Sequence, residues 1–199
     1  MRKSEIPNIA DGFSILIASH LTGDPVPERI AGIELLENAR QLANNNNYGV
    51  FFLGARPEIL TKVIDKCMAK YPGINIVGHH HGYFKDCEVD VVVNEIAASN
   101  ADILFIALGL PQKEYFIHDH VNRFNVGVVL PVGGSFDVFA GTKKRAPQFV
   151  RKYGIEWLWR SFYDLSRMKL VFKSLILYIL ILCREIYNQR ILRRERRIK

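Results

Sequence analysis

Asp11, in the run Ala10-Asp11-Gly12, is a carboxylate beside an apolar stretch that could serve as a general base. Arg29 follows in the run Glu28-Arg29-Ile30-Ala31-Gly32, and a guanidinium there could neutralise a phosphate through charge-assisted hydrogen bonds. An Asp-Gly pair is also common in plain turns, so the spacing leaves a purely structural role for Asp11 open.

Glycine recurs in the four turns that follow four short apolar runs of the chain. Glycine lets backbone N–H groups approach a phosphate closely, and a following helix N-terminus adds a favourable dipole. The turns are not G-x-G-x-x-G or P-loop motifs, so they do not indicate an ordinary nicotinamide or ATP site, and each glycine singly also fits a plain turn. The glycines are Gly54, Gly78, Gly82, Gly109, Gly133 and Gly134.

The apolar runs have no clean period of two, as is typical of strands buried on both faces of a parallel sheet. Mixed segments with helical spacing alternate with them, which predicts an α/β fold with a Rossmann-like, doubly wound parallel sheet and flanking helices. Ligands of such sheets bind beyond the carboxyl ends of the strands, where the glycine turns lie. The expected strands are Tyr48–Leu53, Asn75–Gly78, Ile103–Leu108 and Val126–Val132. The expected helices are Gly32–Asn44, Pro57–Tyr71, Glu88–Ser99 and Pro111–Phe124.

Two groups of metal-binding residue types carry no metal signal. Three histidines at consecutive loop positions, His79–His81, rarely point at one ion, and no further ligand set has a recognised metal spacing. Cys67, Cys87 and Cys183 are widely spaced, as expected of reduced thiols. We therefore expect no metal and no cofactor.

The alternation of strands and helices ends after Gly141, and a basic, aromatic, helix-rich segment follows. We expect an α/β domain over residues 1–142 and a C-terminal helical appendage over residues 143–199. The 199 residues, 49% apolar and 24% charged, exclude a disordered or fibrous chain. Residues 142–199 hold 16 of the 27 Lys and Arg and only four of the 20 acids, a balance of +12 that leaves −5 for residues 1–141. The appendage is therefore expected to meet a polyanion, either nucleic acid or an anionic membrane surface.

The appendage contains an apolar segment, Met168–Tyr187, whose longest uncharged run is Ser174–Cys183. Such a run covers about 15 Å of helix, half of the roughly 30 Å hydrocarbon thickness, so lying in the membrane interface is favoured over spanning it. An apolar helix exposed in the free protein would also favour a homo-oligomer. The start of the chain lacks the apolar core of a secretory signal, which predicts a cytoplasmic N-terminus.

Aromatic and basic residues also meet in Glu156-Trp157-Leu158-Trp159-Arg160, with Arg167 about two helical turns later. Such a face could bind a diphosphate, lie at the headgroup layer of a membrane, or pack on the domain. Its arginines favour the polyanion.

Taken together, these words resemble the bacterial WecG/TagA/CpsF glycosyltransferases. The matches run in order from residue 11 to about residue 170, and words such as Arg145-Ala146-Pro147 are uncommon. The matching residues are Asp11-Gly12, Glu28-Arg29, Gly32, Phe52-Leu53-Gly54, Tyr71-Pro72-Gly73, Gly82-Tyr83-Phe84, Ala101-Asp102, Gly109, Pro111, Glu114, Gly133-Gly134-Ser135-Phe136-Asp137, Ala140-Gly141, Arg145-Ala146-Pro147, Glu156-Trp157, Arg160 and Arg167.

The resemblance implies an inverting, metal-independent enzyme that moves a sugar resembling N-acetylmannosamine from a UDP-sugar donor to a polyprenyl-diphosphate-linked acceptor. Such enzymes build teichoic acid linkage units, enterobacterial common antigen or capsule at the cytoplasmic membrane face. Asp11 matches the proposed general base of the family, and an inverting transfer needs one carboxylate to accept the acceptor's hydroxyl proton. The residues expected to bind substrate are Arg29, Gly32, Gly54, Gly109, Pro111, Lys113, Glu114, Gly133, Gly134, Asp137, Arg160 and Arg167.

The chain departs from the family pattern in two places. The family word Pro-Lys-Gln-Glu reads Pro111-Gln112-Lys113-Glu114 here, so a lysine stands where the family has a ligand-contacting glutamine. Lys113 can meet a phosphate as a point charge but cannot reproduce amide recognition. Family members also carry a longer stretch before the Asp-Gly word, with a first strand lining the pocket. Either the true start lies upstream, or this form lacks part of its active site.

Two other functions remain open on the residues alone. A non-catalytic protein could use the basic tail on nucleic acid or a membrane, although nucleic-acid-binding helices seldom bury an apolar face such as Leu170–Cys183. For that reason we expect no nucleic-acid partner. A nucleotide-dependent oxidoreductase of the same fold class would need the missing Gly-rich fingerprint.

Overall fold

The computed structural model describes residues 13–23, 25–27, 32–152, 159 and 173–188. The chain divides into two compact units, Gly32–Arg145 and a second unit composed of Met1–Ala31 with Ala146–Lys199. The expected domain boundary between residues 142 and 143 stays a prediction.

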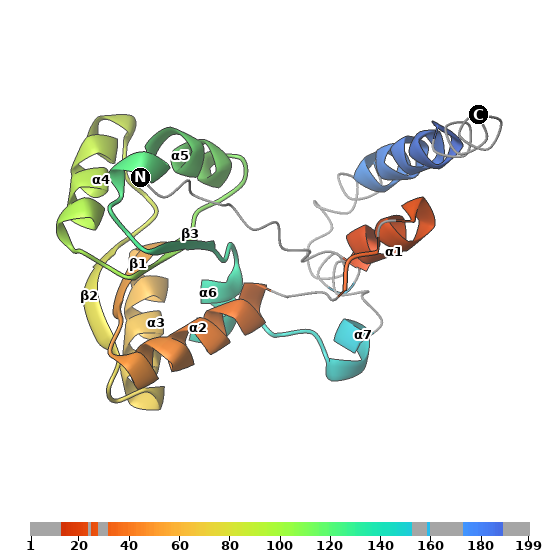
Figure 1. Ribbon diagram of the computed structural model, residues 1–199. Helices are drawn as coiled ribbons and strands as arrows, with labels where there is room; N and C mark the ends of the chain where they lie inside the picture. The colour runs from red at the N-terminus through yellow and green to blue at the C-terminus, as the bar shows by residue number, and fades with distance from the viewer. Residues whose placement is uncertain (1–12, 24, 28–31, 153–158, 160–172, 189–199) are drawn as a thin grey trace. The chain divides into compact units, whose positions relative to one another are not determined.

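The centre of Gly32–Arg145 is a four-stranded, wholly parallel sheet with the order β2-β1-β3-β4 (Figure 1). Its strands confirm the predicted α/β class with a parallel sheet. They are β1 (Gly49–Gly54), β2 (Asn75–His80), β3 (Ile103–Ala107) and β4 (Val128–Pro131).

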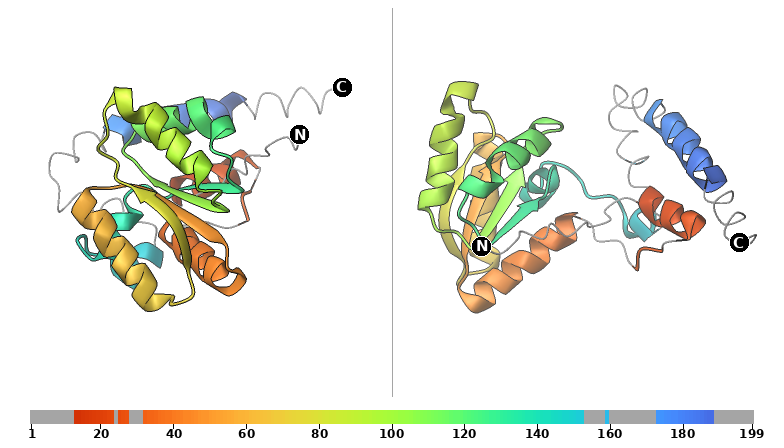
Figure 2. Two further views of the ribbon diagram at one scale, coloured as in Figure 1. Left: turned by 90° about the vertical axis from the view of Figure 1, so that its left-hand side faces the viewer. Right: turned by 45° about the horizontal axis from the view of Figure 1, so that its top comes forward.

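Helices cover both faces of this sheet, and the side chains of β1 alternate between them (Figure 2). Val50 and Phe52 belong to one buried cluster with α2 (Gly32–Asn46), α3 (Pro57–Lys70) and α6 (Ser135–Ala140). Phe51 and Leu53 belong to the other, with α4 (Val89–Ala98) and α5 (Gln112–His120). Because both sets are apolar, the strand is hydrophobic without alternation, as the sequence indicated.

Aromatic rings link the central strands to α6. The ring of Phe52 stacks on that of Phe105 with centroids 5.4 Å apart and meets the edge of Phe136 at 5.7 Å. All three side chains are fully buried. Offset-stacked and edge-to-face pairs at such distances add to the free energy gained from burial.

Three elements end at other residues than predicted. The α2 helix continues through the asparagine run to Asn46 and ends at Asn47, whose φ is +55°. Asn44 is ordered there because its side-chain oxygen accepts a hydrogen bond from the Gly73 N–H at 3.0 Å. The strand β2 extends through His79 and His80, which we had expected in a loop.

The segment predicted as one helix over Pro111–Phe124 is instead α5 followed by a 3₁₀ turn, Val121–Arg123. The α6 helix was not predicted, because six residues are too few for a periodic pattern to stand out. It ends at Gly141, which has the left-handed conformation that glycine adopts without strain (φ +80°).

The second unit contains α1 (Phe13–Thr22), α7 (Gln148–Lys152) and a helix over residues 173–188. The Tyr178 hydroxyl donates a hydrogen bond to the Ser14 carbonyl of α1 at 2.5 Å. Apolar side chains of residues 173–188 are largely exposed: Ile176, Leu177, Ile179, Leu180 and Ile181. In the parts of the chain that the structure describes, no helix is long and apolar enough to cross a bilayer.

We predict that Phe105→Ala destabilises the sheet by about 3–5 kcal/mol, because it leaves a cavity against Phe52 that the backbone fills only in part. Urea denaturation followed by circular dichroism measures the change. Tyr48→Ala is the control, since this aromatic residue precedes β1 with 40% of its surface exposed and should cost far less. Equal losses in the two variants would contradict the assignment of Phe105 to the core.

Candidate functional site

The strand order places the reversal of the chain between β1 and β3. From β1 the chain passes through α3 to β2 on one side and then crosses through α4 to β3 on the other. The connections that leave the carboxyl ends of β1 and β3 therefore run in opposite directions, which opens a crevice where α/β sheets bind ligands. The loops bordering it begin at Ala55 and Leu108.

Gly54 closes β1 tightly against β3. Its φ is +121°, and a Cβ atom there would lie 2.5 Å from the carbonyl carbon and oxygen of Ala107. The next residue, Ala55, donates its N–H to that same carbonyl at 3.1 Å and accepts a hydrogen bond from the Gly82 N–H at 2.8 Å. Gly54 thus has a packing reason to be glycine, and its predicted contact with substrate stays a prediction.

The glycines of the other two loops have open space where a side chain would be. No heavy atom of the described residues comes within 4 Å of a Cβ built on Gly109, Gly133 or Gly134. Gly133 also has a positive φ of +49°. The backbone at these positions is open to close approach by a ligand, which is what the sequence analysis expected of glycine here.

Two cations border the crevice from different loops. Arg56 is exposed, and its Nε donates a hydrogen bond to the Tyr83 hydroxyl at 3.4 Å. This hydrogen bond raises the pKa of Arg56, with further contributions from the nearby acids Glu58 and Asp137. Lys113, at the start of α5, forms an ion pair with Glu114 at 3.1 Å while only 18% of its side chain is exposed.

Asp137 lies in the first turn of α6, after the Gly133-Gly134 turn. Its carboxylate is partly exposed and pairs with Lys143 Nζ at 3.2 Å, while its carbonyl accepts hydrogen bonds from the N–H groups of Thr142 and Lys143. The chain after α6 is thereby folded back on Asp137. Since this carboxylate also acts on the pKa of Arg56, the β1 and β4 loops carry opposite charges at the same end of the sheet.

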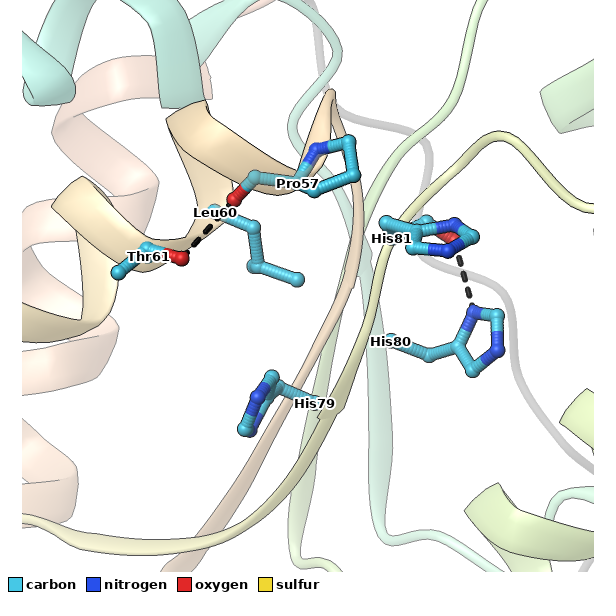
Figure 3. Close-up of a pocket in the computed structure, with 6 residues that line it drawn as sticks. All are labelled: Pro57, Leu60, Thr61, His79, His80 and His81. Atoms are coloured by element: carbon cyan, nitrogen blue, oxygen red, sulfur yellow. Dashed lines mark hydrogen bonds between the residues drawn. The ribbon is translucent and has the colours of Figure 1, made fainter.

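The three histidines line a small pocket beside the first turn of α3, together with Pro57, Leu60 and Thr61 (Figure 3). The His79 ring lies on the side of Leu60 and Thr61, whereas the rings of His80 and His81 lie together on the other side of β2. His80 Nδ1 is 2.8 Å from the His81 carbonyl oxygen. The three imidazoles do not converge on one point.

Four of the predicted site residues, Asp11, Arg29, Arg160 and Arg167, lie outside the described residues, so their roles stay predictions.

Among the remaining predicted residues, Gly32 is the first residue of α2 and Pro111 immediately precedes α5, with a cis peptide bond from Leu110. Their predicted contacts with substrate remain predictions.

Sequence reasoning identified the loops after β1 and β2 but did not select Arg56 or Tyr83 within them. The signal for Arg56 was present, because a cation directly follows the glycine turn of the central strand. The signal for Tyr83 was not, because its partner Arg56 is 27 residues away in the chain.

The comparisons with known proteins agree with this arrangement. A model of the glycosyl transferase WecG/TagA/CpsF family matches residues 5–192. Relatives from three strains of Staphylococcus aureus, NCTC 8325 / PS 47, COL and MRSA252, are 41% identical to the chain over 160 residues. Each carries the name N-acetylglucosaminyldiphosphoundecaprenol N-acetyl-beta-D-mannosaminyltransferase.

The aligned residues are 80% of this chain and 62% of each relative, so the chain spans less than two thirds of the length of the relatives it matches. The family match extends over nearly the whole chain and includes every loop of the crevice. The chain therefore belongs to the WecG/TagA/CpsF family of glycosyl transferases.

Proposed function

We propose that the protein transfers N-acetylmannosamine from a UDP-sugar to an N-acetylglucosaminyl-diphosphate-polyprenol acceptor, with inversion at the anomeric carbon, in the synthesis of a cell-surface polymer. The names of the relatives supply the sugar and the acceptor class. UDP as the carrier and the inverting course follow from the family resemblance. The observation that carries the proposal is the crevice between β1 and β3, with open glycine backbone and cations from two loops.

The donor diphosphate fits the chemistry of this crevice. Open backbone at Gly109 and Gly133-Gly134 allows close approach of phosphate oxygens, and Arg56 and Lys113 supply positive charge. The N-terminus of α3, which begins at Pro57 beside Arg56, directs backbone N–H groups toward the same end of the sheet. Lys113 would act as a point charge in place of the family glutamine.

The proposed reaction is one displacement. The Asp11 carboxylate accepts the proton of the acceptor hydroxyl while that oxygen attacks the anomeric carbon, and the bond from this carbon to the diphosphate oxygen breaks with its electron pair leaving on UDP. Arg29, Arg160 and Arg167 are our candidates to stabilise the developing charge on the diphosphate without a metal ion. A single displacement inverts the anomeric configuration.

A lipid-linked acceptor requires the site to work at a membrane surface, and we propose that the chain binds the cytoplasmic face peripherally. The exposed apolar side chains of residues 173–188 fit the interface of a bilayer. The basic residues that follow, such as Arg190 and Arg193, would add attraction to anionic headgroups.

We predict that Asp11→Asn abolishes release of UDP from UDP-N-acetylmannosamine in the presence of a lipid-diphosphate-N-acetylglucosamine analogue. The amide cannot accept the hydroxyl proton, and loss of a general base typically lowers the rate by about 100- to 10,000-fold. The assay contains EDTA, because the proposal uses arginines instead of a metal. Asp119→Asn, a change at an exposed carboxylate of α5, should retain full activity. Wild-type turnover by Asp11→Asn would disprove the base assignment.

We predict that a methyl group at Gly109 weakens binding of UDP at least tenfold while leaving the melting temperature nearly unchanged, because it enters the open crevice. Calorimetric titration and thermal unfolding give the two quantities. Gly54→Ala is the matched comparison, and it should lower the free energy of unfolding by about 3 kcal/mol or more, because of its positive φ and the contact with Ala107. Unchanged UDP affinity in Gly109→Ala would remove that loop from the donor site.

We predict that Leu180→Glu releases the protein from vesicles of phosphatidylglycerol and phosphatidylethanolamine in a flotation assay. The charge replaces an apolar side chain with 62% of its surface exposed, and anionic headgroups would repel it. Asn188→Glu introduces the same charge at an exposed polar position of the helix and should float like the wild type. Equal flotation of both variants would contradict membrane binding through the apolar residues.

A further inference from the structure

Arg40, in α2, is a charged side chain with no exposed surface. Its Nε donates a hydrogen bond to the Leu36 carbonyl at 3.1 Å, but Nη1 and Nη2 have no hydrogen-bonding partner among the described residues. Burial lowers the pKa of this guanidinium, and the neighbouring Cys67 and Tyr71 oppose the shift. A buried charge with unused donors costs free energy, so its presence calls for a compensating contact.

That contact is with an aromatic ring of α6. The Cζ atom of Arg40 lies 3.6 Å from the centroid of Phe139, and the ring of Tyr71 is farther away at 5.8 Å. A planar guanidinium over a ring at this distance makes both stacking and cation–π contact. Lysine or an aliphatic side chain could fill part of this space but could not reproduce the flat stack.

The α6 helix depends on such contacts because six residues cannot form a stable helix alone. Phe136 and Ala140 bury one side of it in the core. Lys66 Nζ donates to the carbonyl of Ala140 at 2.9 Å and so satisfies the end of the helix. Arg40 holds the remaining ring, Phe139, which is only partly buried.

The same short helix carries the β4 side of the crevice. Asp137 is two residues before Phe139 in the helix, and the open Gly133-Gly134 turn directly precedes Ser135. The Ser135 N–H donates to the Val132 carbonyl at 3.1 Å, which ties the start of α6 to the end of β4. A shift of α6 about Phe139 would therefore move both Asp137 and the open glycines.

We propose that Arg40 is a positioning residue for the nucleotide donor: its stack on Phe139 fixes α6 in the orientation in which Asp137 and Gly133-Gly134 bind that donor. The inference rests on the proposed function for the identity of the ligand. It adds a residue, remote from the crevice in sequence and wholly inside the protein, on which the affinity for the nucleotide depends.

A residue that only fills the core would respond differently to substitution. Replacing an unpartnered buried charge by an apolar side chain of similar length is often neutral or stabilising, because the cost of desolvation disappears. Arg40→Met should therefore keep or raise the melting temperature under either view. Only the positioning role requires the affinity for nucleotide to fall in that stable variant.

The test compares UDP binding by calorimetry, and KM and kcat for the UDP-sugar, in full-length variants. We expect Arg40→Met and Phe139→Leu each to raise the Kd of UDP and the KM at least tenfold with kcat changed less than threefold. Phe139→Tyr keeps the ring and should bind like the wild type, and the Arg40→Met/Phe139→Leu double variant should be no worse than either single one, since both remove the same contact. Arg123→Met, at a half-exposed arginine paired with Asp90, is the control.

Wild-type UDP affinity in a folded Arg40→Met protein would overturn the inference, as would equal affinities of Phe139→Leu and Phe139→Tyr. The second comparison decides the matter if Arg40→Met does not fold. Failure of the wild type to bind UDP would instead refute the proposed function. In that case hydrogen exchange still tests the role of Arg40, because Arg40→Met must speed exchange over residues 135–143 relative to α3 if the stack fixes α6.

Discussion

The contact of Gly54 with Ala107 is the constraint on which the site depends. A side chain at residue 54 would collide with the backbone of β3, so the two central strands can approach at their carboxyl ends only because that atom is absent. The approach brings Ala55 within hydrogen-bonding distance of Ala107, and Ala55 in turn holds Gly82. The loops of three strands are fixed by this one chain of backbone hydrogen bonds, and Arg56 and Tyr83 are placed by it.

The fourth loop is fixed by side chains and not by the sheet. The α6 helix is held from α3 by Lys66 and from α2 by Arg40, through a carbonyl and a ring respectively. Both contacts use cations, and both act on the half of the helix that faces away from the Gly133-Gly134 turn. The crevice thus combines a rigid border made of backbone with a border whose geometry depends on two buried or half-buried charges.

The sequence was sufficient to predict the parallel sheet, because the strands are apolar on both faces and their turns are marked by glycine. It also predicted the glycine loops of the crevice. It could not predict α6, whose stability comes from tertiary contacts, nor the extension of β2 through His79 and His80, whose polar side chains obscure a strand that is paired only on one side. Arg40 was missed because an arginine on a helix is ordinarily solvated, and its burial depends on residues distant in the chain.

The alternation of side chains along β1 divides the interior into two clusters that share no residue. One contains the residues around α2, α3 and α6, and the other lies under α4 and α5. The sheet between them insulates each from changes in the other, so substitutions on opposite faces should have additive effects on folding. Mutational drift under α4 and α5 can therefore proceed without disturbing the stack on Phe139, which leaves one half of the interior free to diverge while the other stays tied to the chemistry.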